Sequence, residues 1–393
     1  MHLNAENYIF FFLVFTSLTP VFYVSPLATS TASATHYNYF IIIFFTSLFY
    51  LMTKNYFFLI FLYELLIVPV FFLLKEFGHY YRKVQASYFI LIWALMGSFF
   101  IFIGFLLFFF QVDYFFFNFF FFSSYNFWGI FFICLGFSVK VPLWPFHFWI
   151  SRAHAEGPTN LSIFLSGVLV KLSVYGILKF LYLSPVKLNF VIFFYFALIG
   201  VIDATLKMLI QIDSKVVIAF STTVQMNLIS FVIFSLATNS LYTLNLALLN
   251  HLLTASILFF FADQILTRFN SREFFFLSGL YYYLPMLSAS LVIFIVNQIN
   301  FPGFMGFFLD IFFLQTSLVV NTFSSFFLFF FLFVIEHLYI LIFFLKILYG
   351  VSSKFSYVHF KDLSLEECLL GFYLISTSFL LGMFPLFLDV LFV

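Results

Sequence analysis

Residues 134–180 read CLGFSVKVPLWPFHFWISRAHAEGPTNLSIFLSGVLVKLSVYGILKF, a stretch that combines apolar side chains with prolines and lysines. A proline inside a helix removes a backbone donor and clashes with the preceding turn. In hydrocarbon, the carbonyl groups of a broken helix must be satisfied by protein or by water in a cavity. Lys140 lies just before Pro142, and Lys171 lies on the following helix, although a lysine at membrane depth costs at least ~2.5–3.5 kcal/mol. This pattern indicates a path for ions or protons.

The composition of the whole chain restricts its fold class. Hydrophobic residues make up 65% of the 393 residues, and charged residues make up 8%. A soluble fold could not bury so many apolar side chains, so we predict an all-α polytopic membrane protein. The net charge of +1 gives no reason to expect nucleic-acid binding. Cys134 and Cys368 both lie in apolar sequence, which argues against a disulfide framework.

Apolar segments separated by polar joints follow one another along the chain. Because a spanning helix needs ~20 mainly apolar residues, we expect about twelve transmembrane helices. The segment at 127–155 should be broken, and the segment at 281–322 should form two pieces with a turn at Phe301-Pro302-Gly303, where proline and glycine oppose a helix. The predicted spans are 8–24, 38–52, 55–74, 85–110, 127–155, 157–183, 187–210, 214–236, 239–262, 281–322, 325–350 and 363–391.

The sequence lacks the common motifs for cofactor binding. It contains no G-x-G-x-x-G, no Walker loop and no Cys-x-x-Cys spacing, so nothing in it indicates nucleotide, flavin or iron–sulfur binding. We therefore expect no cofactor and no metal in this chain. Any redox chemistry associated with the protein would take place in other subunits.

The central stretch also resembles a known family. VKVPLWPFHFWISRAHAEGP at residues 139–158, followed by LVKLSVYG at 169–176, is similar to the signature of subunit 4 of respiratory complex I. That subunit is one of the antiporter-like, proton-pumping subunits of the complex. Related subunits share the core at 145–149, whereas AHAE at 153–156 together with VKL at 170–172 points to subunit 4 rather than to subunits 2 or 5.

The resemblance implies a fold of two inverted five-helix repeats, each with one broken helix. Residues 37–184 would form the first repeat and residues 185–350 the second, and residues 351–393 would form a C-terminal connection and a transmembrane helix. Residues 1–36 would form one helix and a loop, and the first two helices of the family are expected to be absent. Inverted repeats with broken helices place their sites near the bilayer midplane.

The resemblance also implies a proton relay, which begins with Glu64 and Lys140. Burial disfavours the charged form of each group, and their mutual attraction favours it. Moving the two apart would therefore let Lys140 release its proton. The alternatives are that Glu64 caps a helix near an interface and that Lys140 extends to the lipid headgroups.

The remaining relay positions implied by the resemblance are Lys171, His251 and Asp310. Lys171 and His251 each lie centrally in an apolar segment. Asp310 stands where the family has a glutamate. Because its side chain is shorter, it would rely more on water to reach the same partner. Gln225 stands where the family usually has a histidine, and a glutamine cannot take up or release a net proton at these pH values.

Several other titratable residues are secondary candidates. His147 suits proton relay because histidine titrates near neutral pH, although a packing role between aromatic residues fits it equally well. Glu336 and His337 have no counterpart in the family pattern; they could compensate for Gln225 or Asp310, or lie near a surface. We interpret His154 and Glu156 as part of a loop before Pro158, which would start the next helix.

These expectations define a membrane-arm subunit of mitochondrial NADH:ubiquinone oxidoreductase that translocates protons. NADH, FMN, iron–sulfur clusters and ubiquinone would be bound by other subunits, so this chain would have no redox catalytic residues. Two alternatives are a cation/proton antiporter of the related family and a proton-inert structural subunit of the membrane arm.

The expected partners are neighbouring antiporter-like subunits, other membrane-arm subunits and lipids, without nucleic acid. A separate subunit or fragment would replace the missing N-terminal helices. The expected location is the mitochondrial inner membrane, crossed several times. The 75 phenylalanines fit a T-rich mitochondrial genome as the coding source.

Overall fold

The computed structural model describes residues 10, 14, 31–53, 55–78, 81–109, 127–183, 191–235, 240–269, 271–273, 279–320, 323–350 and 361–383. All regular elements in these residues are helices, apart from one isolated bridge between Asp213 and Glu273. The chain divides into two compact units, Met1–Gly200 and Val201–Val393.

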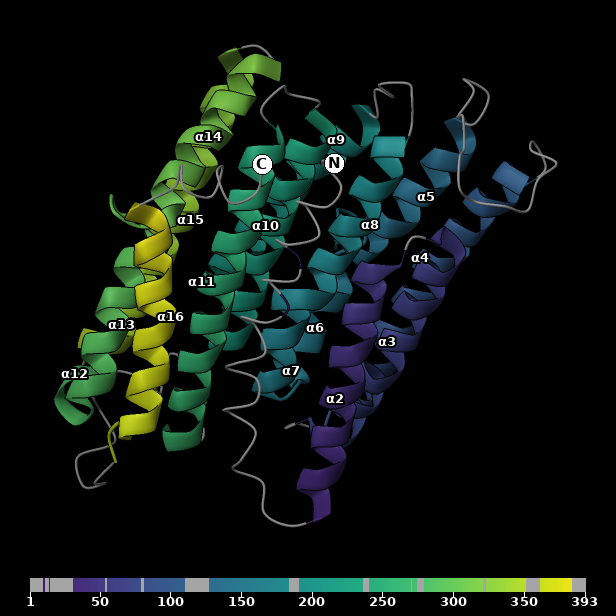
Figure 1. The fold of residues 1–393 in the computed structure, drawn as a ribbon. Coiled ribbons are helices and arrows are strands. Elements are labelled where there is room, and N and C mark those ends of the chain that lie inside the picture. Colours follow the sequence, from purple (N-terminus) through teal and green to yellow (C-terminus); the bar gives the residue numbers. More distant parts are fainter. Residues whose placement is uncertain are drawn as a thin grey trace. The chain divides into compact units, whose positions relative to one another are not determined.

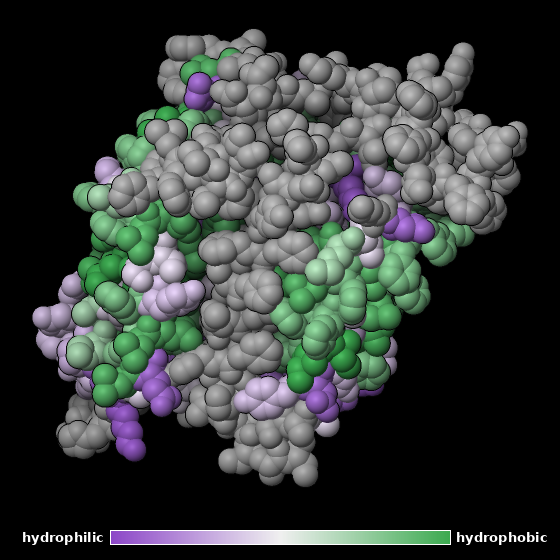
Figure 2. All heavy atoms as spheres, in the orientation of Figure 1, coloured by the Kyte–Doolittle hydropathy of each residue, from purple (hydrophilic) through white to green (hydrophobic). Residues whose placement is uncertain are grey.

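The prediction of an all-helical membrane protein with many spans is confirmed. Within the described residues, eight helices are long and apolar enough to cross a membrane, and three shorter apolar helices accompany them. Figure 2 shows broad hydrophobic areas on the visible face, with hydrophilic residues toward both its lower and its upper edge. The predicted span at 8–24 lies outside the described residues except at Phe10 and Val14, which are helical.

The first unit contains a helix that is broken where the sequence predicts it. α5 ends at Lys140, and α6 begins at Phe148 after a turn. The indole Nε1 of Trp149 donates to the Val139 carbonyl at 3.1 Å, so the next helix satisfies a carbonyl near the break. The helices of this unit (Figure 1) are α2 (Thr31–Met52), α3 (Tyr56–Phe77), α4 (Lys83–Phe109), α5 (Phe127–Lys140), α6 (Phe148–Glu156), α7 (Thr159–Phe164), the π-helix η3 (Leu165–Leu169), α8 (Val170–Leu183) and the first half of α9 (Val191–Ile210).

Glycines let α4 and α5 approach each other closely. A Cβ atom at Gly97 would lie 2.9 Å from the Gly136 carbonyl oxygen, and one at Gly104 would lie 2.7 Å from the Gly129 carbonyl oxygen. Small residues at helix contacts are a common way to pack helices in membranes, where the lipid provides no hydrophobic drive for their association.

The second unit contains the second predicted break. α13 ends at Gln298 and α14 begins at Met305, and between them Asn300 and Gly303 have positive φ angles of 57° and 105°. Asparagine and glycine tolerate this left-handed region better than other residues do. The helices of this unit are the end of α9, α10 (Ser214–Ser235), α11 (Ser240–Phe269), α12 (Leu280–Tyr283), α13 (Pro285–Gln298), α14 (Met305–Val320), α15 (Phe323–Tyr349) and α16 (Leu365–Met383).

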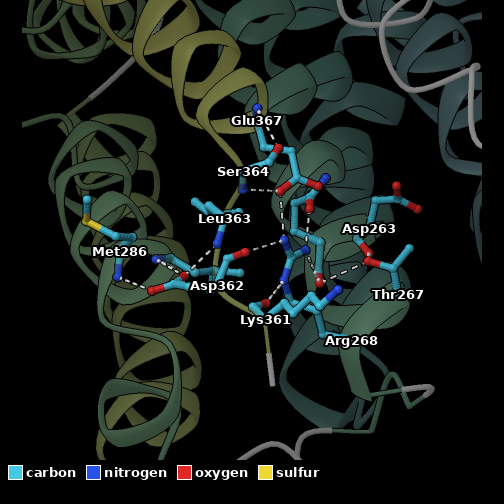
Figure 3. A network of polar contacts seen from close by, with 11 residues as sticks. Asp263, Thr267, Arg268, Met286, Lys361, Asp362, Leu363, Ser364 and Glu367 are labelled. Atoms are coloured by element: carbon cyan, nitrogen blue, oxygen red, sulfur yellow. Dashed lines mark hydrogen bonds and ion pairs between the residues drawn. The ribbon is translucent and has the colours of Figure 1, made fainter. Parts of the chain in front are cut away.

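A polar network joins three helix ends in the second unit (Figure 3). Arg268, in the last turn of α11, pairs with Glu367 in α16 at 2.7 Å and donates to the Lys361 carbonyl. Asp362 accepts hydrogen bonds from Met286 N at 2.7 Å and Leu287 N at 3.1 Å, at the start of α13. The first amide groups of a helix have no partner within it, so Asp362 acts as a cap for α13.

The start of α16 carries a capping box within the same network. Ser364 N donates to Glu367 Oε2 at 2.8 Å, and Glu367 N donates to Ser364 Oγ at 3.3 Å. This reciprocal pair satisfies two amide groups and fixes where α16 begins. The network thus ties α16 to α11 and α13 through short-range polar contacts.

We expect Asp362→Ala to destabilise the second unit, because two amide groups at the start of α13 would lose their acceptor. The loss of a helix cap typically costs ~0.5–2 kcal/mol, and the thermal melting of the purified protein measures it. Lys361→Ala is the matched control, because its exposed side chain is removed while the carbonyl that accepts from Arg268 remains. Equal melting temperatures for the two variants would contradict the capping role.

Candidate functional site

An ion pair between a buried lysine and a half-buried glutamate lies at the break of the first unit. Lys140 Nζ in α5 is 2.5 Å from Glu64 Oε1 in α3, and the side chains are 2% and 29% exposed, respectively. The ammonium also lies 4.0 Å from the centroid of the Tyr63 ring, a geometry in which the ring face attracts a cation. The structure thus brings Glu64 and Lys140 into contact, and these are the two residues that the resemblance to subunit 4 predicts to form a pair.

The aliphatic stem of Lys140 is held by a glycine on α4. A Cβ atom at Gly97 would lie 3.2 Å from both Cγ and Cε of Lys140, which is tighter than an ordinary contact. Any larger residue at position 97 would press on the lysine stem. Gly97 therefore helps to direct the ammonium toward Glu64, a role that the sequence alone did not reveal.

Lys171 lies in α8, directly after the π-helical turn η3. Its side chain is fully buried, and its Nζ donates to the Ser166 carbonyl at 2.6 Å. Ser166 belongs to η3, where the wider turn changes the usual hydrogen-bond register. A backbone carbonyl is thereby turned toward a buried amino group, which lowers the cost of keeping that polar group away from water.

Three tyrosines fill the space between α2, α3 and α8. The hydroxyl of Tyr50 donates to the Leu172 carbonyl at 3.0 Å, and that of Tyr63 donates to the Leu169 carbonyl at 3.4 Å. The Tyr50 ring lies 5.8 Å from the Tyr63 ring and 5.9 Å from the Tyr175 ring, both centroid to centroid. Because Tyr63 also faces Lys140, this cluster connects the surroundings of Lys140 to the backbone beside Lys171.

His147, His154 and Glu156 are the other titratable candidates near the first break. His147 is buried at the start of α6 and stacks on Phe148 with a centroid separation of 4.5 Å. The interpretation of His154 and Glu156 as loop residues is wrong, because both lie in the last turn of α6. The connection to α7 needs only Gly157 and Pro158, which stop and restart the helix without further loop residues.

The second unit contains a cavity with polar walls. The wall includes His251 from α11, Gln225 from α10, Asn300 from the second break, and Glu336 and His337 from α15. The side chain of Glu336 is buried, and Gln225 Nε2 donates to its Oε1 at 3.3 Å. Glu336 and His337 therefore face the same cavity as His251 and do not point to the lipid headgroups.

Asn300 connects this cavity wall to Asp310. Its Nδ2 donates to Asp310 Oδ2 at 2.8 Å and lies 3.2 Å from His337 Nε2. The other ring nitrogen of His337, Nδ1, lies 2.7 Å from the Phe333 carbonyl oxygen. Sequence reasoning missed Asn300, although a polar residue directly before the break at 301–303 was a usable signal.

The two units thus each place candidate residues at a helix break. In the first unit Glu64 and Lys140 are in contact, and Lys171 lies in α8. In the second unit His251 shares a cavity with His337, which Asn300 joins to Asp310. Among the described residues, no group of three or more His, Cys, Asp and Glu side chains is arranged to hold a metal ion.

Curated relatives are similar over a large part of the chain. NADH-ubiquinone oxidoreductase chain 4 of Acanthamoeba castellanii is 30% identical over 333 residues, which are 82% of this chain and 66% of that protein. Chain 4 of Chondrus crispus is 30% identical over 266 residues, 66% of this chain and 54% of that protein. NADH-quinone oxidoreductase subunit M of Rickettsia conorii is 30% identical over 259 residues, 64% of this chain and 52% of that protein. The chain spans about half to two thirds of these relatives' length.

Solved structures share the fold at low sequence identity. A chain of respiratory complex I from Thermus thermophilus with bound aureothin has a TM-score of 0.80 and 16% identity, covering 98% of this chain and 86% of that one. A chain of the Mrp complex from Dietzia has a TM-score of 0.82 and 14% identity, covering 98% of this chain and 82% of that one.

Residues 53–336 match the sequence model of the family described as NADH:quinone oxidoreductase/Mrp antiporter, TM, and the chain belongs to that family.

Proposed function

We propose that this chain is a proton-translocating subunit in the membrane arm of NADH:ubiquinone oxidoreductase. The observation that carries the proposal is the ion pair of the buried Lys140 with the half-buried Glu64 at the break between α5 and α6. The names of the similar chain 4 proteins support it, as does the family to which the chain belongs. Redox chemistry in other subunits would drive the proton movement, and NADH, FMN, iron–sulfur clusters and ubiquinone would be bound there.

The proposed first step is a change in the Glu64–Lys140 pair. With the partners in contact at 2.5 Å, the carboxylate stabilises the ammonium against the cost of burial. When they separate, the apolar surroundings favour the neutral amine, and Lys140 gives up its proton. Lys171, which is held by the Ser166 carbonyl, is the proposed next acceptor, with water carrying the proton between them.

The proposed relay continues through the second unit. His251 and Asp310 are its next groups, and Glu336 and His337 provide further proton-holding groups in the cavity that His251 lines. Gln225 itself carries no transferable net proton, but it donates to Glu336. We therefore propose that Glu336 supplies the titratable group that position 225 lacks. His147 remains a secondary candidate beside the first break.

The proposal extends to architecture, partners and location. Residues 37–184 and 185–350 would be two inverted repeats, each with one of the two observed breaks. Neighbouring antiporter-like subunits would pack against the exposed apolar helices, together with lipids. The location would be the mitochondrial inner membrane, with the chain encoded in the mitochondrion.

A second candidate function is cation/proton antiport without redox coupling. The family description, which includes the Mrp antiporter, favours it. An antiporter would exchange Na⁺ or K⁺ for protons when the purified chain is placed alone in sealed vesicles. A complex I subunit would show no exchange alone and would migrate with many partners on a native gel.

Single substitutions of the ion pair test the proposed mechanism. We expect Glu64→Gln and Lys140→Met each to lower proton pumping and the coupled electron transfer about tenfold or more, because a buried charge without its partner costs ~3–5 kcal/mol. The rates of proton pumping and of electron transfer are each measured in sealed vesicles that contain the assembled complex. Glu76→Gln, at the exposed end of the same helix as Glu64, should pump at the native rate. A native rate of proton pumping in Lys140→Met would refute the mechanism and favour a structural role for the chain.

The packing of Gly97 against Lys140 provides an independent test. Gly97→Ala should displace the lysine stem and lower pumping about tenfold, the factor that ~1.4 kcal/mol produces in a rate. Gly104→Ala is the matched control, because it crowds the same α4–α5 contact through Ile133 and Gly129 without touching Lys140. If both variants lose pumping equally, Gly97 acts through helix packing alone.

A further inference from the structure

The end of α16 packs directly against the backbone of the second break. Gly382 lies in the last turn of α16 and is buried. A Cβ atom there would lie 2.5 Å from three backbone atoms, which are the Gly303 carbonyl oxygen, the Phe304 carbonyl carbon and the Met305 amide nitrogen. Side chains do not approach a backbone that closely, so α16 can occupy this position only because residue 382 is a glycine.

Two further residues of α16 contact the helix before the break and the break itself. The Asn297 amide nitrogen in α13 donates to Ser378 Oγ at 3.3 Å, and both side chains are fully buried. The Phe379 ring packs edge-on against the Phe304 ring, with 5.5 Å between the ring centroids. The end of α16 therefore contacts α13, the break and the first residue of α14.

The break that α16 contacts sets the distance between Asn300 and Asp310. Asn300 precedes the break, Asp310 lies on α14 after it, and the Asn300 amide nitrogen donates to Asp310 Oδ2 at 2.8 Å. A Cβ atom at Gly306, in the first turn of α14, would overlap the Asn300 side chain. Because a helix moves largely as a unit, a displacement of Met305 carries Asp310 with it. Hydrogen bonds are lost near ~3.6 Å, so a displacement of about 1 Å is enough to break this contact.

We propose that Gly382 is a positioning residue, through which α16 holds α14 at the distance that lets Asp310 meet Asn300. The start of α16 is fixed as well, because Glu367 pairs with Arg268 at the end of α11 (Figure 3). α16 is thus held at one end by this polar network and holds the second break at its other end. The contribution of Gly382 to proton pumping rests on the proposed function, whereas its effect on the Asn300–Asp310 contact does not.

The test is the infrared absorption of the Asp310 carboxylate in the resting, fully assembled protein at about pH 9, where a carboxyl group is normally ionised. The band is assigned by its loss in Asp310→Asn. Asn300→Gly removes the donor but keeps a residue that accepts the left-handed backbone, so it gives the band position without the contact. We expect Gly382→Ala to shift the band in the same direction, because the added methyl group displaces the break. The double variant should absorb where Asn300→Gly does, since both changes act on one contact.

Gly371→Ala is the matched control on the same helix. A Cβ atom at Gly371 would lie 3.7 Å from the nearest atom, in the Phe260 ring, which is an ordinary contact. This variant should keep the native band. A native band in Gly382→Ala, or a double variant whose shift is the sum of the two single shifts, would overturn the proposal.

Phe379→Ala provides a second test of the same contact without adding atoms to it. Its loss of the ring contact with Phe304 should shift the Asp310 band in the same direction as Asn300→Gly, and a native band would overturn the proposal even if Gly382→Ala does not assemble. The band is read without turnover, so its outcome is independent of the pumping rate of Lys140→Met. A shifted band together with native pumping in Lys140→Met would therefore support the positioning role and contradict only the proposed function.

Discussion

The ammonium of Lys140 is the charge on which the first unit depends. An isolated charge in an apolar interior is too costly to keep, and even a paired one is barely compensated. Glu64 lies 2.5 Å from this ammonium, and the Tyr63 ring covers it at 4.0 Å. In the proposed mechanism the charge is stable only while Glu64 stays close, and a small movement of α3 relative to α5 changes its protonation. This sensitivity makes the pair suitable for moving protons.

The same constraint explains the irregular backbone of both units. In hydrocarbon, a polar backbone group must be bonded within the protein or to water in a cavity. At the first break Trp149 satisfies the Val139 carbonyl, and in η3 the Ser166 carbonyl accepts from Lys171. At the second break the side chain of Asn300 bonds Asp310. In η3 and at the second break, a titratable side chain thus lies beside a group that can stabilise one of its protonation states.

The sequence predicts those features that depend on local chemistry. Proline after Lys140 and the Phe-Pro-Gly run at 301–303 both oppose helix continuation, and the structure has its two breaks there. The π-turn before Lys171 was not predicted, because Ser166 and Gly167 fit an ordinary helix and only tertiary packing selects the wider turn. His154 and Glu156 were assigned to a loop because their polarity suggested one, whereas the structure continues α6 through them. Likewise, the contacts of Gln225, Asn300 and Asp310 join residues far apart in sequence or across a break, which periodicity cannot reveal.

The central claim is that Glu64 and Lys140 act as one unit, and a double-mutant comparison tests it most directly. Residues that act together show strong coupling between their substitutions, whereas independent sites have additive effects. The rate of proton pumping would be measured in sealed vesicles for Glu64→Gln, Lys140→Met and the double variant, with the assembled complex quantified in each. The account predicts that the double variant pumps no worse than the more damaging single variant. A double variant whose loss equals the sum of the two single losses in free energy would contradict it.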